Sequence, residues 1–188
     1  YHYTAPTDGR IWILNASNGS IIAEYTLATT GGLGGPLAAD TDYDLVADRI
    51  YVGDTLGNLW RLDMSKRNNG SLIVQAPNSL GSDPLFIAKD ADGNRQAITA
   101  PLSSAFNDDR KHMLYFGTGS FYKTGDNEVP AAPAIPKTDT FYGIIDEGTL
   151  IDGRSSLLQQ QILREVDLSG GRKARAITQN AITSSQKG

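Results

Sequence analysis

Short runs of alternating apolar and polar residues follow one another along most of the chain, and glycine-containing turns separate them. Residues 51–63, YVGDTLGNLWRLD, contain an aromatic β-favouring run, a short turn, and a second run with alternating large apolar residues. This pattern is typical of a β-hairpin that buries one face. Helical spacing is found only in part of residues 155–166, SSLLQQQILREV, where we favour a strand because the surrounding chain is β. We therefore predict an all-β protein.

The hairpin pattern is repeated earlier in the chain. Residues 3–15, YTAPTDGRIWILN, match residues 51–63 at a constant offset of 48 residues, which aligns Trp12 with Trp60. Because one large aromatic residue recurs at the same place in both copies, we expect both tryptophans to pack between sheets.

A third, more diverged copy consists of residues 113–122, MLYFGTGSFY, and, after a proline-rich insertion, residues 140–146, TFYGIID. Two similar segments precede the second and third copies, GPLAAD at 35–40 and APLSSA at 100–105. The repeating unit is therefore predicted to contain four strands.

A period of 40 to 50 residues built from short strands is typical of a β-propeller blade. About three such blades fit into the chain, whereas a closed propeller needs about four or more. We predict that residues 1–188 form a single domain, a fragment of a larger propeller built from repeated short antiparallel strands. Within it, residues 124–139 are expected to form a surface loop insertion, and the polar tail 177–188 is expected to be poorly ordered.

An acidic segment, DTDYDLVAD, directly precedes the second hairpin. Asp40, Asp42, Asp44 and Asp48 occupy positions 1, 3, 5 and 9 of an EF-hand-like loop, and the carbonyl oxygen of Val46 stands at position 7. Oxygen ligands at this spacing suit calcium better than a transition metal, which prefers imidazole or thiolate. The loop is therefore a candidate calcium site, and the alternative is an acidic surface turn whose side chains extend into water.

Two positions depart from the EF-hand pattern. Leu45 occupies position 6, where a glycine normally allows a sharp left-handed turn, and Tyr51 stands where a glutamate normally completes the ligand set. We expect a site of the weaker class, with a dissociation constant of roughly 10⁻⁵ to 10⁻³ M.

Charge and composition exclude several other classes. A formal net charge of −4 gives no cationic field for nucleic acid or anionic membranes, and no apolar run reaches the roughly 18 residues of a membrane helix.

The chain lacks cysteine, and its two histidines, His2 and His112, have no catalytic partner at a diagnostic spacing, so both are expected to be solvated or capping residues. Asp90, Asp92 and Asn94 are interpreted as a hairpin turn. The first residues lack a signal-peptide layout, which indicates a mature or excised piece.

The segments GPLAADTDYDLVADRIYVGDTLGNLWRLDMS, ITAPLS, MLYFGTGSFY, TFYGIID and SLLQQQIL resemble, in this order, the C-terminal domain of the PilY/PilC family of type IV pilus tip proteins. The resemblance covers about residues 33–165. It implies a modified quinoprotein-like propeller, located at the pilus tip, the cell surface or the outer membrane, that binds calcium through this loop. The family usually has glycine at the position of Leu45.

The resemblance also implies a non-enzymatic role. Calcium would influence pilus extension, retraction and adhesion, and the partners would be pilus components such as minor pilins, with host or abiotic surfaces as adhesive targets. Two alternatives from other classes remain: a fragment of a quinoprotein dehydrogenase, and a carbohydrate-binding or integrin-like propeller.

Overall fold

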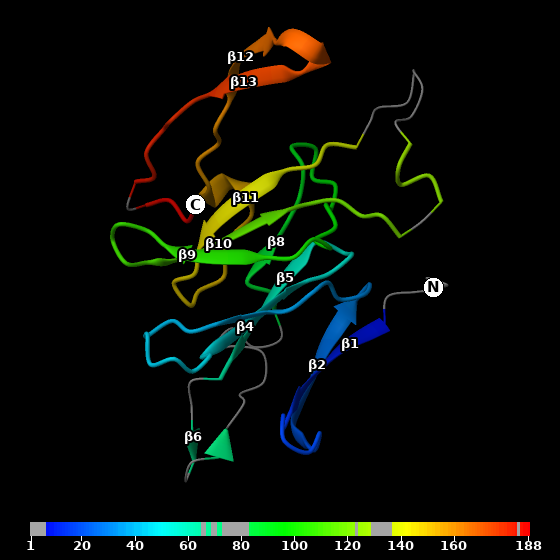
Figure 1. Cartoon of the computed structure of the whole chain (residues 1–188), viewed down its shortest axis with the longest axis vertical. Coiled ribbons are helices and arrows are strands. Elements are labelled where there is room, and N and C mark those ends of the chain that lie inside the picture. The colour runs from blue at the N-terminus through cyan, green and yellow to red at the C-terminus, as the bar shows by residue number, and fades with distance from the viewer. Residues whose placement is uncertain are drawn as a thin grey trace.

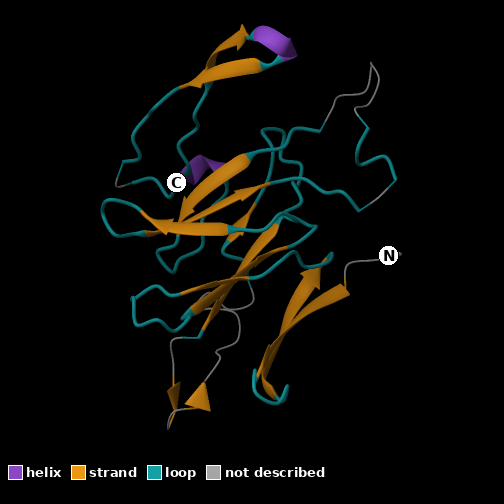
Figure 2. Ribbon diagram, in the orientation of Figure 1, coloured by secondary structure: helices purple, strands orange, loops and turns teal. Residues whose placement is uncertain are grey.

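The computed structural model describes residues 7–64, 67–68, 71–72, 83–122, 124–128, 137–183 and 185–188. Within these ranges the protein consists of strands, long connections and two short 3₁₀ helices (Figures 1 and 2). The elements are β1 (Thr7–Leu14), β2 (Ile21–Thr30), β3 (Leu37–Ala39), β4 (Arg49–Gly53), β5 (Asn58–Asp63), β6 (Arg67–Asn68), β7 (Ser71–Leu72), β8 (Phe86–Ile87), β9 (Ser103–Phe106), β10 (His112–Gly117), β11 (Phe141–Ile145), η1 (Arg154–Ser156), β12 (Ile162–Asp167), η2 (Ser169–Gly171) and β13 (Lys173–Ile177). The all-β prediction is confirmed.

The central sheet has the strand order β3-β4-β5-β8. Strands β4 and β5 form the antiparallel hairpin predicted for residues 51–63, with Val52 opposite Trp60. Gly57 lies in the connecting turn with φ of 82°, and a Cβ atom there would stand 2.6 Å from the carbonyl oxygen of Gln96. Only glycine fits this position. Any other residue would be strained in the left-handed backbone, and its side chain would collide with the segment that contains Gln96.

A second sheet has the order β11-β10-β9. It contains the third copy as predicted, because β10 and β11 pair antiparallel with Phe116 opposite Tyr142. The two segments that precede the repeats also form strands, β3 and β9, each at the edge of its sheet. In the first copy, the prediction of a hairpin within residues 3–15 is wrong: Gly9, expected in the turn, lies inside the continuous strand β1, which pairs with β2. The hairpin turn is formed instead by residues 15–20, where the N–H of Asn15 donates to the carbonyl oxygen of Ser20 at 2.8 Å. Residues 3–6 lie outside the described part of the chain.

Side chains alternate across the central sheet, so each of its faces contributes to a different core. Tyr51 and Leu59 pack with residues of β8, β10 and β11, whereas Val52 and Trp60 pack with the β1–β2 hairpin. The central sheet is thus covered on both sides, by β9–β11 on one and by β1–β2 on the other (Figure 1). This stacking of small sheets is the arrangement expected of neighbouring propeller blades, although the sheets are open and do not close into a ring.

The two tryptophans differ in their surroundings. Trp60 is 3% exposed, as predicted, but Trp12 is 49% exposed, so the expectation that both pack between sheets is wrong for Trp12. The β1–β2 hairpin has the central sheet on one face only, and Trp12 lies on the other face, where no described element covers it.

The C-terminal third contains a separate hairpin. Residues 155–166 begin within η1 and enter a strand only at Ile162, so the preferred strand assignment holds for the end of that segment alone. Strands β12 and β13 pair with each other, and Figure 1 shows this hairpin set apart from the larger sheets. No helix in the described ranges is long and apolar enough to cross a membrane.

The end of the polar tail lies against the second sheet. The N–H of Ile145 donates to the carbonyl oxygen of Lys187 at 2.7 Å, and the N–H of Leu158 donates to that of Gly188 at 2.6 Å. Hydrogen bonds from Lys111 and Lys187 lower the pKa of Glu147 to about 2. Residues 177–188 are therefore polar and poor at forming a core, yet the last two of them make specific hydrogen bonds. Of the predicted loop insertion, only residues 124–128 and 137–139 are described.

Candidate metal centre

The acidic loop connects β3 to β4, two antiparallel neighbours of the central sheet. The last pair of the ladder is Ala39 opposite Arg49, and the N–H of Asp48 donates to the carbonyl oxygen of Ala39 at 2.9 Å. The two ends of the loop are therefore held together by the sheet, and residues 40–48 turn back on themselves between them.

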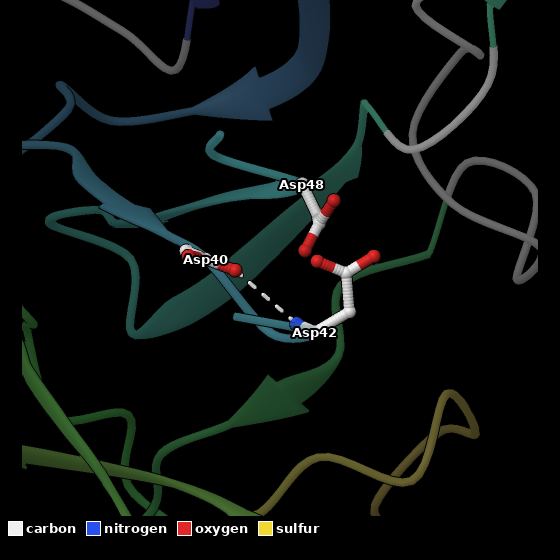
Figure 3. A group of neighbouring side chains, drawn as sticks. All are labelled: Asp40, Asp42 and Asp48. Atoms are coloured by element: carbon white, nitrogen blue, oxygen red, sulfur yellow. Dashed lines mark hydrogen bonds between the residues drawn. The ribbon is translucent and has the colours of Figure 1, made fainter. Parts of the chain in front are cut away.

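Three of the predicted ligands are brought together. Asp40, Asp42 and Asp48 each offer a carboxylate oxygen, and these oxygens all lie within 4.8 Å of one another. Figure 3 shows the carboxylates of Asp42 and Asp48 facing each other, with Asp40 beside them. This is the one such group of acidic or histidine ligands among the residues that the structure describes.

The backbone of the loop is organised around Asp40. Its Oδ1 accepts a hydrogen bond from the N–H of Tyr43 at 2.7 Å, and its Oδ2 accepts one from the N–H of Leu45 at 2.8 Å. Burial acts to raise the pKa of Asp40, but these backbone hydrogen bonds outweigh it and lower the pKa. Asp40 is therefore held as a charged carboxylate at the centre of the turn.

Asp44 and Val46 are placed differently. Asp44 is not part of the three-carboxylate group, and its Oδ1 accepts a hydrogen bond from the N–H of Val46 at 2.8 Å. Its own N–H donates to Asp42 at 3.1 Å. Asp44 thus shapes the turn through local hydrogen bonds, and its predicted role as a ligand, like that of the Val46 carbonyl, stays a prediction.

The electrostatics of the group favour a bound cation. A hydrogen bond from the N–H of Asp44 lowers the pKa of Asp42, but burial and the charges of Asp44, Asp48 and Asp40 outweigh it and raise the pKa. Asp48 is buried, and its Oδ2 accepts hydrogen bonds from the N–H and hydroxyl of Thr41 at 2.7 and 3.0 Å. The donor set, all oxygen and all acidic, fits a hard divalent cation such as calcium.

Leu45 adopts the left-handed backbone that position 6 requires, with φ of 69°. Its side chain is 94% exposed, so no packing compensates for the strain, which costs an L-residue about 1–2 kcal/mol. We expect Leu45→Gly to bind calcium about threefold to tenfold more tightly, because glycine adopts this turn without strain and the gain is only partly offset by its greater freedom when unfolded. Isothermal titration would measure the change, and equal or weaker binding would contradict it.

A buried polar cluster adjoins the base of the loop, and no sequence motif predicted it. The carboxylate of Asp146, fully buried after β11, lies 3.2 Å from Arg49 Nη1 and 2.9 Å from Arg61 Nε, and accepts a hydrogen bond from the Tyr51 hydroxyl. His112 Nδ1 lies 3.3 Å from the same hydroxyl. The prediction that His112 is solvated or capping is wrong: the residue is buried within the second sheet, and burial lowers its pKa.

Comparison with known proteins supports the propeller assignment. A family model described as the PilY1 beta-propeller domain matches residues 7–169. The crystal structure of the Pseudomonas aeruginosa PilY1 C-terminal domain is similar, with a TM-score of 0.75 and 29% sequence identity, over 94% of this chain and 41% of that one.

Two curated relatives are type IV pilus biogenesis factors. PilY1 of Pseudomonas aeruginosa strain PAO1 is 34% identical over 78% of this chain and 14% of its own length. A PilY1 homolog of Xylella fastidiosa is 28% identical over 94% of this chain and 13% of its own length. The chain thus spans about one seventh of the length of these relatives.

Proposed function

The chain belongs to the PilY1 beta-propeller family, and from that premise we propose that it is a calcium-binding propeller module of a type IV pilus biogenesis factor. The observation that carries the proposal is the convergence of Asp40, Asp42 and Asp48 within a loop whose ends are closed by the central sheet. The matching relatives are pilus biogenesis factors, which favours this role over the quinoprotein and carbohydrate-binding alternatives.

In this proposal the acidic residues of the loop have different roles. Asp40 orders the turn through its backbone hydrogen bonds, while Asp42 and Asp48 bring negative charge to the same point from opposite ends of the loop. Calcium, when bound, supplies the positive charge that offsets their mutual repulsion. The Asp44 carboxylate and the Val46 carbonyl would complete the ligand set.

The role in the pilus follows from family membership. We propose that the module is extracytoplasmic, at the pilus tip, the cell surface or the outer membrane, and that its partners are pilus components such as minor pilins. Calcium can affect extension, retraction or adhesion to a host or abiotic surface only if the loaded and free forms differ in affinity for these partners. We therefore place the effect of calcium at the surface around the loop and assign no catalytic role to the module.

Calcium titration of the purified protein tests the proposal. We expect isothermal titration to show one site in the wild type and at least about tenfold weaker binding in Asp42→Asn, which removes one ligand charge at constant size. The matched control is Asp92→Asn, in the exposed turn where Asp90 accepts the hydrogen bonds, and it should bind as the wild type does.

The same variants address the pilus role when placed in the complete protein in a piliated bacterium. Asp42→Asn is expected to alter surface piliation and twitching motility, and Asp92→Asn is not. Absence of calcium heat from the wild type, or identical titrations for the wild type and Asp42→Asn, would refute the calcium site. Unchanged piliation and twitching in an Asp42→Asn strain with weakened calcium binding would refute its role in the pilus.

A further inference from the structure

The acidic loop contacts the neighbouring sheet through an aromatic pair. Tyr43, which lies between Asp42 and Asp44, places its ring 4.7 Å from that of Phe106, measured between centroids. Phe106 is the last residue of β9 and belongs to the second sheet. Tyr43 is largely exposed and has φ of 67°, so its ring reaches Phe106 from a backbone conformation that the turn imposes.

The aromatic contact continues into the buried interface between the sheets. The ring of Phe106 lies 5.3 Å from that of His112, which in turn lies 5.6 Å from that of Tyr51 on the central sheet. A second connection starts at the other end of the loop, where Arg49 directly follows Asp48 and donates to Asp146 at 3.2 Å. The loop is therefore joined to the second sheet at two points, one through Tyr43 and one through Arg49.

We propose that the acidic loop controls the seam between the sheets β3-β4-β5-β8 and β9-β10-β11, because its closed form holds Tyr43 against Phe106. The inference rests on the proposed calcium binding. The N–H of Tyr43 donates to Asp40, so the carboxylate group and the aromatic contact share one backbone turn. A cation that draws the carboxylates together stabilises this turn, whereas their repulsion without a cation favours its opening and the loss of the ring contact.

Thermodynamic linkage makes the inference testable at a residue that carries no ligand atom. If calcium strengthens the contact between Tyr43 and Phe106, that contact must strengthen calcium binding by the same factor. An aromatic pair of this kind corresponds to about a twofold to tenfold change in affinity. Phe106→Leu, which keeps most of the apolar volume, should therefore weaken calcium binding by about this factor, as should Tyr43→Ala.

The experiment is a double-mutant cycle in calcium affinity, measured by isothermal titration on the wild type, Tyr43→Ala, Phe106→Leu and the double variant. The double variant should bind no more weakly than the weaker single variant, because both changes remove one contact. Phe141→Leu is the matched control, because Phe141 is an exposed phenylalanine that also belongs to the second sheet but stacks on Tyr115 rather than on the acidic loop, and the affinity of this variant should stay within about twofold of the wild type.

Hydrogen exchange gives an independent readout. Calcium should slow amide exchange in residues 103–117 of the wild type and of Phe141→Leu, and Tyr43→Ala should lose this effect while residues 40–48 keep theirs. Calcium heat with no change in Phe106→Leu, or multiplying losses in the double variant, would overturn the coupling and leave the calcium site intact. No calcium heat in the wild type would overturn the calcium site and the coupling together.

Discussion

Replacing Asp146 with alanine is expected to lower the free energy of unfolding by about 3–5 kcal/mol, because it removes the buried carboxylate that lies beside two guanidinium groups, one of which, that of Arg61, is itself buried. The Arg61 side chain is 3% exposed, and its Nε lies 2.9 Å from Asp146 as an ion-pair contact that is not aligned as a hydrogen bond. Its second carboxylate partner, Asp63, lies farther away at 3.5 Å and is partly exposed. The variant would therefore leave a buried cation with one distant partner.

Urea denaturation of the purified protein would measure this loss. Asp146→Asn keeps a hydrogen-bond acceptor for the Tyr51 hydroxyl and should recover only part of the stability, since losing the negative charge beside two guanidinium groups costs more than losing the hydrogen bond. The control is Asp109→Ala in the exposed turn between β9 and β10, where a change within about 0.5 kcal/mol is expected. A loss at Asp146 no larger than the loss at Asp109 would show that the ion cluster is not required for the fold.

Local patterns in the sequence predicted most of the fold. The β4–β5 hairpin, the β10–β11 pair and the edge strands β3 and β9 were all identified from repeated motifs. The β4–β5 hairpin depends on alternation and turn residues within about fifteen positions, which is the range over which a sequence pattern indicates structure. The strands β10 and β11 are farther apart in the sequence, and their pairing was predicted from their likeness to that hairpin. The position of the β12–β13 hairpin does not depend on a pattern within such a short range, so it could not be predicted.

In the candidate site, too, the local contacts could be predicted and the long-range contacts could not. The spacing of Asp40, Asp42 and Asp48 predicted their convergence because alternate residues of a tight turn face one point. By contrast, Asp146 is 97 residues from Arg49 in the sequence, and His112 meets Tyr51 across two sheets. Contacts of this kind arise from how the sheets stack, so a single sequence carries no signal for them.

The different burial of Trp12 and Trp60 has a physical explanation that the sequence repeat does not indicate. Trp60 Nε1 donates to the buried carboxylate of Asp54 at 2.9 Å, which satisfies the polar atom of the ring inside the core. In the first copy, the position equivalent to Asp54 is Pro6, which has no acceptor side chain. Burying an indole N–H without a partner is costly, and the half-exposed position of Trp12 is consistent with that cost.

Asp54 itself is therefore expected to be a second position of high sensitivity. Its Oδ1 accepts the N–H groups of Leu56 and Asn58, both at 2.9 Å, and its Oδ2 accepts the Asn58 side chain at 2.8 Å in addition to Trp60. Asp54 is fully buried, and Asp54→Ala would leave these donors without their acceptor, so we expect a loss of about 3 kcal/mol or more in the free energy of unfolding.

Substitution of the tryptophans separates the role of Asp54 in the turn from its role beneath the indole. In urea denaturation, Trp60→Phe should lose about 1–3 kcal/mol, because it leaves a cavity and one unused acceptor position on Asp54, whereas Trp12→Phe should change stability by less than about 0.5 kcal/mol. Trp60→Phe should also cost much less in the Asp54→Ala background than in the wild type, since the contact is already absent there. Equal costs for the two tryptophans, or for Trp60 in both backgrounds, would mean that the Asp54 carboxylate does not hold the ring, and that strand packing alone buries it.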